Sequence, residues 1–131
     1  MIVVDTSVWI QVLNDAGTPK ARRFEELLEQ GAPLALTEVV YAEILQGLRS
    51  EKEVRRVDEH LRSFPVLGLD GLADFRLAAS LYRTARRKGQ TIRRTLDCLI
   101  AAPCVRTGAP ILHDDADFDR LASCTELRVY L

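Results

Sequence analysis

The chain has 131 residues, of which 47% are hydrophobic and 28% are charged, and its formal net charge at pH 7 is −1. These values predict one folded domain with a buried core, and they give no overall sign of a nucleic-acid-binding protein. The longest apolar runs are far too short to span a bilayer, so we expect a cytoplasmic protein without a membrane segment. The three cysteines form no C-x-x-C pair, which indicates reduced thiols and gives no sign of a zinc site or a disulfide framework.

The first predicted element is a buried strand at residues 2–4, a run of β-favouring apolar side chains. Asp5 follows where this strand must end, and Thr6, Ser7 and a short helix over residues 8–13 come next. Ligands of open α/β sheets bind in the crevice outside the carboxyl ends of the strands. Asp5 is therefore either the N-cap of the helix or the first member of an acidic site.

The later elements alternate between helices and short apolar strands. We expect helices at about 18–30, 37–48, 51–63, 72–88, 96–107 and 117–122, and strands or extended segments at 33–36, 65–69, 109–112 and 127–130. Apolar strands without a period of two are typical of a parallel sheet covered by helices on both faces. The sequence thus predicts a single three-layer α/β/α domain over residues 1–131. The apolar face from Val54 to Phe64 is a candidate dimer surface.

Glu43 lies on the apolar side of its predicted helix. No cation lies within one helical turn of it, so an ionised carboxylate there needs a partner from elsewhere in the fold. Gly47 leaves space beside it. The alternative is a glutamate at the edge of the apolar stripe whose tip reaches water.

Asp97 stands immediately before a run of five apolar residues. A structural explanation is available for it, because Thr95 can be the N-cap and the helix dipole favours an acid in the first turn. Arg93 or Arg94 can also pair with it. Only in combination with other acids does Asp97 indicate a functional site.

A dense acidic cluster follows the predicted strand at 109–112. Its members are Asp114, Asp115, Asp117 and Asp119. The preference of acids for helix N-termini explains one or two of them, but not four. If the chain is extended here, Asp115 and Asp117 face one site, and Asp114 and Asp119 face away.

Together these acids predict a metal site. Carboxylates at strand ends and helix starts suit Mg²⁺ or Mn²⁺, which bind hard oxygen ligands. Without a cation, the clustered carboxylates would raise one another's pKa and destabilise the fold. With one or two cations, the site could activate a water molecule and stabilise the leaving oxygen of a phosphodiester. His60 and His113 are predicted to be structural or solvated.

Four segments resemble, in order, the PIN-domain family, and most closely its VapC-type toxins. They are V-V-D-T-S-V-W-I, E-V-V-Y-A-E-I-L-Q-G, T-L-D-C-L-I-A and L-H-D-D-A-D-F-D-R-L-A. The resemblance implies a Mg²⁺- or Mn²⁺-dependent endoribonuclease that cuts RNA, often tRNA or rRNA, and leaves a 5′-phosphate and a 3′-hydroxyl. It also implies a homodimer and a cognate antitoxin that binds operator DNA.

The resemblance assigns roles to individual residues. The catalytic, metal-binding quartet falls on Asp5, Glu43, Asp97 and Asp115, and the additional metal-binding acid of some members falls on Asp117. Ser7 falls where the family often has a hydroxyl close to the site. For Thr6 and Ser7, helix capping and support of the site acids fit equally well. Pro103 departs from the pattern, because similar sequences usually carry a helix former there. A mid-helix proline costs about 3 kcal/mol if unrelieved, and it predicts a kink near Leu99.

Six basic residues within twelve positions precede Asp97 without an intervening acid. They are Arg83, Arg86, Arg87, Lys88, Arg93 and Arg94. A solvated helix end explains Arg86, Arg87 and Lys88, but not Arg93 and Arg94. A cationic rim beside a metal-filled acidic pocket would instead bind the RNA backbone, and we favour this function for Arg86, Arg87, Arg93 and Arg94.

Three other function classes are compatible with parts of the pattern. A PIN-like nuclease for RNA processing or DNA flaps would need no antitoxin. A binding module without turnover would sequester RNA or an antitoxin, but the presence of all four acids argues against it. A phosphoacceptor domain also has an Asp at a strand end, but this chain lacks the Asp-x-Asp start of one phosphatase class and a suitably placed lysine.

Overall fold

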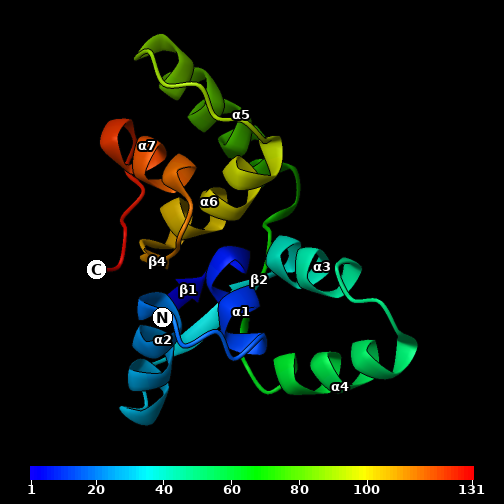
Figure 1. Ribbon diagram of the computed structural model, residues 1–131. Coiled ribbons are helices and arrows are strands. Elements are labelled where there is room, and N and C mark those ends of the chain that lie inside the picture. The colour runs from blue at the N-terminus through cyan, green and yellow to red at the C-terminus, as the bar shows by residue number, and fades with distance from the viewer.

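Four short parallel strands form the middle layer of the computed structural model, which describes residues 1–131 (Figure 1). They are β1 (Ile2–Val4), β2 (Leu34–Thr37), β3 (Val66–Leu67) and β4 (Ile111–Leu112), in the order β3-β2-β1-β4. Ile2 of β1 lies opposite Leu34, and Val3 lies opposite both Ala35 and Ile111. Because β1 is paired on both edges and buried, it carries only apolar side chains.

Seven helices cover the two faces of the sheet. They are α1 (Thr6–Leu13), α2 (Pro19–Glu29), α3 (Glu38–Gln46), α4 (Glu51–Leu61), α5 (Gly71–Arg87), α6 (Thr95–Thr107) and α7 (Ala116–Cys124). The steps from β1 to β2 and from β2 to β3 go toward the same edge, whereas the step from β3 to β4 goes back across the sheet. Right-handed crossovers therefore place α1 to α4 on one face and α5 and α6 on the other. Figure 1 shows α5, α6 and α7 together on one side of the strands, which confirms the three-layer α/β/α prediction.

Trp9 fixes α1 against the sheet. Its indole Nε1 donates a 3.0 Å hydrogen bond to the carbonyl of Val4, and its ring packs edge-on against Phe24 and Phe64, with centroids 4.9 and 5.0 Å away. Aromatic packing of this kind is stabilising beyond the area it buries. The residue that joins β1 to α1, Asp5, is thereby held in one place.

The apolar face of α4 packs inside the domain. Val57 and Leu61 are each only 1% exposed, and Phe64 contacts Trp9 and Phe24. This face was a candidate dimer surface, and that assignment is wrong because its main side chains already belong to the core.

Two other predictions at element ends are also wrong. The segment 127–130 forms only an isolated bridge from Val129 to Ile111, because β4 is two residues long and offers little edge to pair with. Thr95 lies inside α6, and the cap position is taken by Arg94 without a side-chain capping bond. The helix runs unbroken through Pro103 to Thr107, and the kink near Leu99 stays a prediction.

All three cysteines are free thiols, as predicted. None of the helices combines the length and the apolar character that crossing a membrane requires.

Candidate active site

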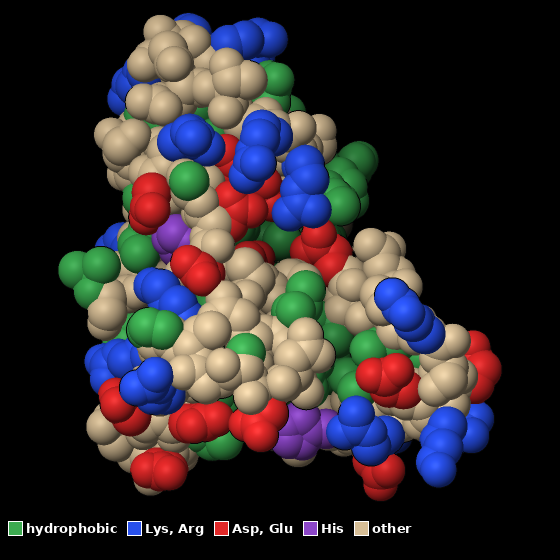
Figure 2. Space-filling view, viewed as in Figure 1, with side chains coloured by type: hydrophobic (Ala, Val, Ile, Leu, Met, Phe, Trp, Pro, Cys, Tyr) green, Lys and Arg blue, Asp and Glu red, His purple; other side chains and the backbone are tan.

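The four predicted site acids come from four segments that meet at the carboxyl edge of the sheet. Asp5 follows β1, Asp115 follows β4 as the N-cap of α7, Asp97 lies in the first turn of α6, and Glu43 lies on α3. Burial is the main cause that raises the pKa of Asp97 and of Asp5, and nearby charges add to it: those of Asp115 and Asp5 at Asp97, and that of Glu43 at Asp5. Figure 2 shows acidic side chains gathered in a hollow on this face, with basic side chains beside them.

Asp5 is both an N-cap and a member of the acidic site. Its Oδ2 accepts the backbone N–H of Ser7 at 3.0 Å and the Ser7 hydroxyl at 2.6 Å. The same hydroxyl accepts the N–H of Asp114 at 2.9 Å, which connects α1 to the segment after β4. Burial raises the pKa of Asp5, and the Ser7 hydrogen bonds oppose that rise.

Glu43 obtains its partners from distant parts of the chain, as its apolar helix face predicts. The hydroxyl of Thr6 donates a 2.7 Å hydrogen bond to Oε1, and Nη1 of Arg94 lies 3.2 Å from Oε2. The Glu43 side chain is only 9% exposed. Thr6 on α1 thus fixes the orientation of a carboxylate on α3.

Asp97 is fully buried, and only one of its two carboxylate oxygens has a hydrogen-bond partner. Its Oδ1 accepts a 2.8 Å bond from Nη2 of Arg94, whereas its Oδ2 has no hydrogen-bond partner. Burial raises the pKa of Asp97 to about 6, even though Arg94 acts in the opposite direction. A buried carboxylate oxygen without a donor is costly unless a cation or another group binds it.

Asp115 and Asp117 share one arginine. Nη2 of Arg93 lies 3.1 Å from Oδ1 of Asp115, and its Nε lies 3.1 Å from Oδ2 of Asp117. Arg120 lies 2.5 Å from the other oxygen of Asp117. Burial raises the pKa of Asp117, but the hydrogen bonds from Arg120 and Arg93 outweigh it and hold the value below the usual range. Both oxygens of Asp117 are therefore occupied by guanidinium groups.

The segment around these two acids is not extended as we expected. Asp115 has extended dihedral angles, but Asp117 lies in the first turn of α7, and its N–H donates to Oδ1 of Asp115 at 3.0 Å. Asp114 points toward Gln11, and Asp119 pairs with His113. The acids nevertheless separate into the two pairs that we predicted.

His113 has a structural role, as predicted, and the structure places it beside the site acids. It is 4% exposed, its Nδ1 accepts the N–H of Asp115 at 3.0 Å, and its Nε2 lies 3.1 Å from Oδ1 of Asp119. These bonds fix the backbone that presents Asp115. The His-x-Asp spacing in the sequence could have indicated the contact with Asp115, because a side-chain acceptor often binds the N–H two residues later.

The four arginines of the predicted RNA surface fall into two groups. Arg93 and Arg94 are 68% and 52% exposed, but their guanidinium groups bind the site acids. Arg86 and Arg87 are exposed at the end of α5, where Arg86 lies 5.8 Å from the ring centroid of Tyr82. The sequence predicted the position of these cations beside the acids, but not the direct pairing of Glu43 with Arg94.

The donor set fits a hard divalent cation. Every candidate ligand is a carboxylate, and Oδ2 of Asp97 is buried without a donor. No three potential ligand side chains are arranged as a ready-made metal cage, and Arg93 and Arg94 each bridge two of the acids. Binding of an ion by these acids would require the guanidinium contacts to give way.

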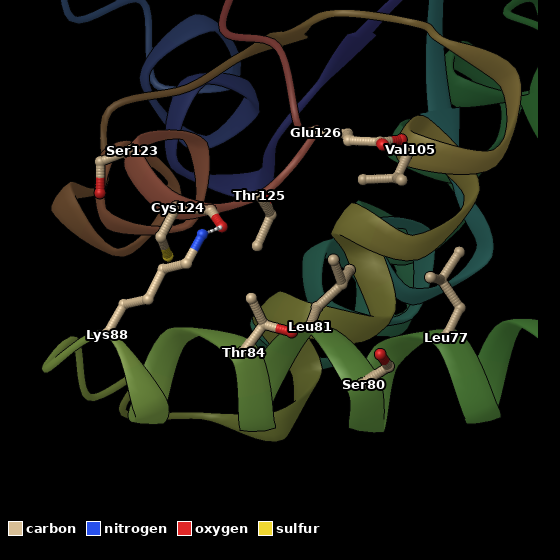
Figure 3. Close-up of a pocket in the computed structure, with 10 residues that line it drawn as sticks. All are labelled: Leu77, Ser80, Leu81, Thr84, Lys88, Val105, Ser123, Cys124, Thr125 and Glu126. Carbon is tan, nitrogen blue, oxygen red and sulfur yellow. Dashed lines mark hydrogen bonds between the residues drawn. The ribbon is translucent and has the colours of Figure 1, made fainter.

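The largest cavity of the molecule lies elsewhere. It has a volume of about 620 Å³ and is bounded by α5, α6 and the end of α7 (Figure 3). Leu77, Leu81 and Val105 form its apolar part, and Nζ of Lys88 donates to the carbonyl of Cys124 across it at 3.0 Å. None of the site acids lines it, so cavity size does not identify the active site.

Comparisons with known proteins identify the family of the chain. The family model for the PIN domain matches residues 2–123. Ribonuclease VapC11 of Mycobacterium tuberculosis is 41% identical over 129 residues, which are 98% of this chain and 96% of that protein. The structure of VapBC2 from Rickettsia felis, bound to a DNA fragment from their promoter, is similar with a TM-score of 0.77 at 18% identity, covering 99% of this chain and 98% of that one.

A second solved structure has the same fold. It is VapC20 of Mycobacterium tuberculosis, described as a sarcin-ricin loop cleaving toxin, with a TM-score of 0.66 at 21% identity, covering 98% of this chain and 99% of that one. The family match and the relative at 41% identity each extend over nearly the whole chain. The chain therefore belongs to the PIN-domain family and, within it, to the VapC ribonucleases.

Proposed function

We propose that this VapC ribonuclease is the toxin of a toxin–antitoxin pair and hydrolyses RNA phosphodiester bonds with Mg²⁺ or Mn²⁺. The proposed catalytic, metal-binding residues are Asp5, Glu43, Asp97 and Asp115. The observation that carries the proposal is Oδ2 of Asp97, which is buried without a partner, in a carboxyl group whose pKa is raised by burial and by the charges of Asp115 and Asp5.

A bound divalent cation would supply a Lewis acid for the scissile phosphate and would lower the pKa of an attacking water molecule. The protein groups orient the ligands for this chemistry. Ser7 holds one oxygen of Asp5 with two hydrogen bonds, and Thr6 holds one oxygen of Glu43. In each case the other oxygen of the carboxylate is left for a different partner. Oxygen ligands alone do not distinguish Mg²⁺ from Mn²⁺.

Asp117 remains a predicted additional metal ligand, but its contacts favour another role. Its two oxygens are held by Arg93 and Arg120, and it is fully buried. We assign to it the anchoring of Arg93 beside Asp115. The helix α7 and the segment before α6 are thereby tied together at the edge of the site.

The RNA is expected to cross the basic end of α5 on its way to the acids. Arg86 and Arg87 have exposed side chains there and can bind backbone phosphates, while Arg93 and Arg94 lie next to the acids themselves. The relative VapC20 is described as cleaving the sarcin-ricin loop. A structured RNA, either tRNA or rRNA, is the substrate class that we propose for this chain.

The partner that we propose is a cognate antitoxin. The similar structures include complexes described as VapBC2 from Rickettsia felis and VapBC from Salmonella typhimurium, both bound to DNA. We also propose a homodimer of single-domain subunits. An RNA-processing nuclease without an antitoxin is the alternative, and a small DNA-binding reading frame immediately upstream of the gene would argue against it.

The test is RNA cleavage by the purified chain. Total RNA is incubated with Mg²⁺ or Mn²⁺, with EDTA, and with the Asp97→Asn variant, and an exposed-acid variant, Asp15→Asn, serves as the control. We expect metal-dependent cleavage to 5′-phosphate and 3′-hydroxyl ends by the wild type and the control only. Cleavage that survives both EDTA and Asp97→Asn would contradict the metal–carboxylate mechanism, and no cleavage of any RNA would favour a binding module.

A further inference from the structure

The guanidinium group of Arg94 occupies the space between two proposed metal ligands. Its Nη1 lies 3.2 Å from Oε2 of Glu43, and its Nη2 lies 2.8 Å from Oδ1 of Asp97. These are the two terminal nitrogens of one planar fork, so a single side chain bridges α3 and the start of α6. A cation thus already lies at the acidic site, and the protein itself supplies it.

Asp97 and Asp117 differ in how completely arginine satisfies them. Asp117 has both oxygens bound by guanidinium groups, from Arg93 and Arg120. Asp97 is equally buried, yet Arg94 reaches only Oδ1, and Oδ2 has no partner. Asp97 therefore has one carboxylate oxygen without a partner, whereas both oxygens of Asp117 are paired.

Arg94 can leave the acids without disturbing the core. It belongs to the connection between α5 and α6, and its side chain is 52% exposed. The connection is fixed by Ile92, which is only 2% exposed, so Arg94 is free to turn toward solvent while its backbone stays in place. The carboxylate ends of both pairs are buried, so Arg94 leaves them at low cost only when another cation takes its place.

We propose that Arg94 is a built-in competitor for the metal site and sets its affinity. In the metal-free protein it neutralises Glu43 and Asp97, which would otherwise repel each other and their acidic neighbours. A divalent cation bound by the same carboxylates is repelled by a guanidinium group at this distance, so Arg94 leaves both acids when the ion binds. This inference rests on the proposed metal site.

The test is Mn²⁺ binding, measured by isothermal titration calorimetry on metal-free protein at constant ionic strength. The variants are Arg94→Gln, Arg94→Lys, which keeps the charge but lacks the two-pronged fork, and Arg83→Gln. Arg83 is the matched control because it is exposed, shares a cavity wall with Arg93 and makes no ion pair. It therefore reports the effect of removing one nearby charge without removing the bridge.

We expect Arg94→Gln to bind Mn²⁺ roughly fivefold more tightly than the wild type, the ratio that a partly exposed ion pair can account for. Arg94→Lys should show a smaller gain, and Arg83→Gln should stay close to the wild type. If neither Arg94 variant binds more tightly than Arg83→Gln while the wild type binds Mn²⁺, the inference is overturned and the proposed function stands. If no variant binds Mn²⁺ at all, the metal site itself is overturned.

Discussion

Arg94 binds one oxygen of Asp97 and leaves the other buried without a partner. Burial raises the pKa of this carboxyl to about 6, so its ionised form costs folding free energy at neutral pH. A residue with this property lowers stability unless a ligand satisfies it. Stability and activity should consequently respond in opposite ways when Asp97 loses its charge.

Asp97→Asn is the first prediction. RNA cleavage should fall by a factor on the order of 100 or more, because a metal ligand stabilises several kcal/mol of transition-state charge. The Tm of the metal-free variant should be no lower than that of the wild type. Saturating Mn²⁺ should raise the Tm of the wild type but not that of the variant, since a ligand stabilises only the state that binds it. A variant that unfolds at a clearly lower Tm without metal would contradict this explanation.

His113 provides a second prediction, about the positioning of Asp115. His113→Leu removes the acceptor for the N–H of Asp115 and should weaken Mn²⁺ binding by roughly tenfold, as losses of supporting groups at metal sites do. His113→Asn should restore most of the affinity, because an Asn side-chain oxygen accepts the N–H two residues later. Calorimetric titration measures both. Equal loss in the two variants would mean that His113 contributes only its packing volume.

The third prediction concerns Asp74 and Arg106, which connect α5 to α6 away from the site. Both oxygens of Asp74 accept from Arg106, at 3.0 to 3.2 Å, and Asp74 is 1% exposed. Burial raises the pKa of Asp74, but the Arg106 hydrogen bonds outweigh it, so the pKa lies below its usual value. We expect Asp74→Asn to lower the free energy of unfolding by about 2 kcal/mol, less than a fully buried pair because Arg106 is one-third exposed.

The sign of the pH dependence follows from that lowered pKa. A carboxyl whose pKa is lower in the folded protein stabilises the fold above its unfolded pKa, about 3.9, and loses this contribution as the pH falls through the folded value. Denaturant titrations between about pH 5 and pH 2 should therefore show a steeper loss of stability in the wild type than in Asp74→Asn. Parallel curves would contradict the assignment.

The fourth prediction distinguishes direct RNA contact by Arg86 and Arg87 from a general effect of the protein's positive charge. In an inactive Asp97→Asn background, Arg86→Gln together with Arg87→Gln should weaken RNA binding and reduce the slope of log K against log salt by about 0.7 for each lost phosphate contact. The control pair, Arg55→Gln with Arg56→Gln, removes the same charge from the exposed face of α4. Equal changes in the two slopes would argue against a specific RNA path along α5.

Local signals were sufficient to predict most of the fold. The buried strand before Asp5 and the helices predicted from residues 18 and 37 reflect short-range chemistry, and the structure confirms them, with Thr18 and Thr37 as the N-caps of α2 and α3. The strand predicted around Val129 was wrong, because strand pairing depends on how much of β4 is free to pair. The periodicity of the sequence does not report this.

The convergence of the acids was also predictable, since carboxyl ends of parallel strands lie at one edge. The ion-pair partners of the acids were harder to predict. The bridge from Arg94 to Glu43 joins residues 51 positions apart, and the pair of Asp74 with Arg106 joins residues 32 apart. Such pairs depend on the path of a connection or on the alignment of two helices. Only the tertiary structure determines either.

The most direct measurement is the location of manganese in crystals of the wild-type protein grown with Mn²⁺, from anomalous diffraction at the manganese edge. The account predicts a peak at coordination distance, about 2.1 to 2.3 Å, from Oδ2 of Asp97 and from at least one of Asp5, Glu43 and Asp115, with Arg94 turned away. No peak at these carboxylates, with Arg94 still bridging Glu43 and Asp97, would contradict it.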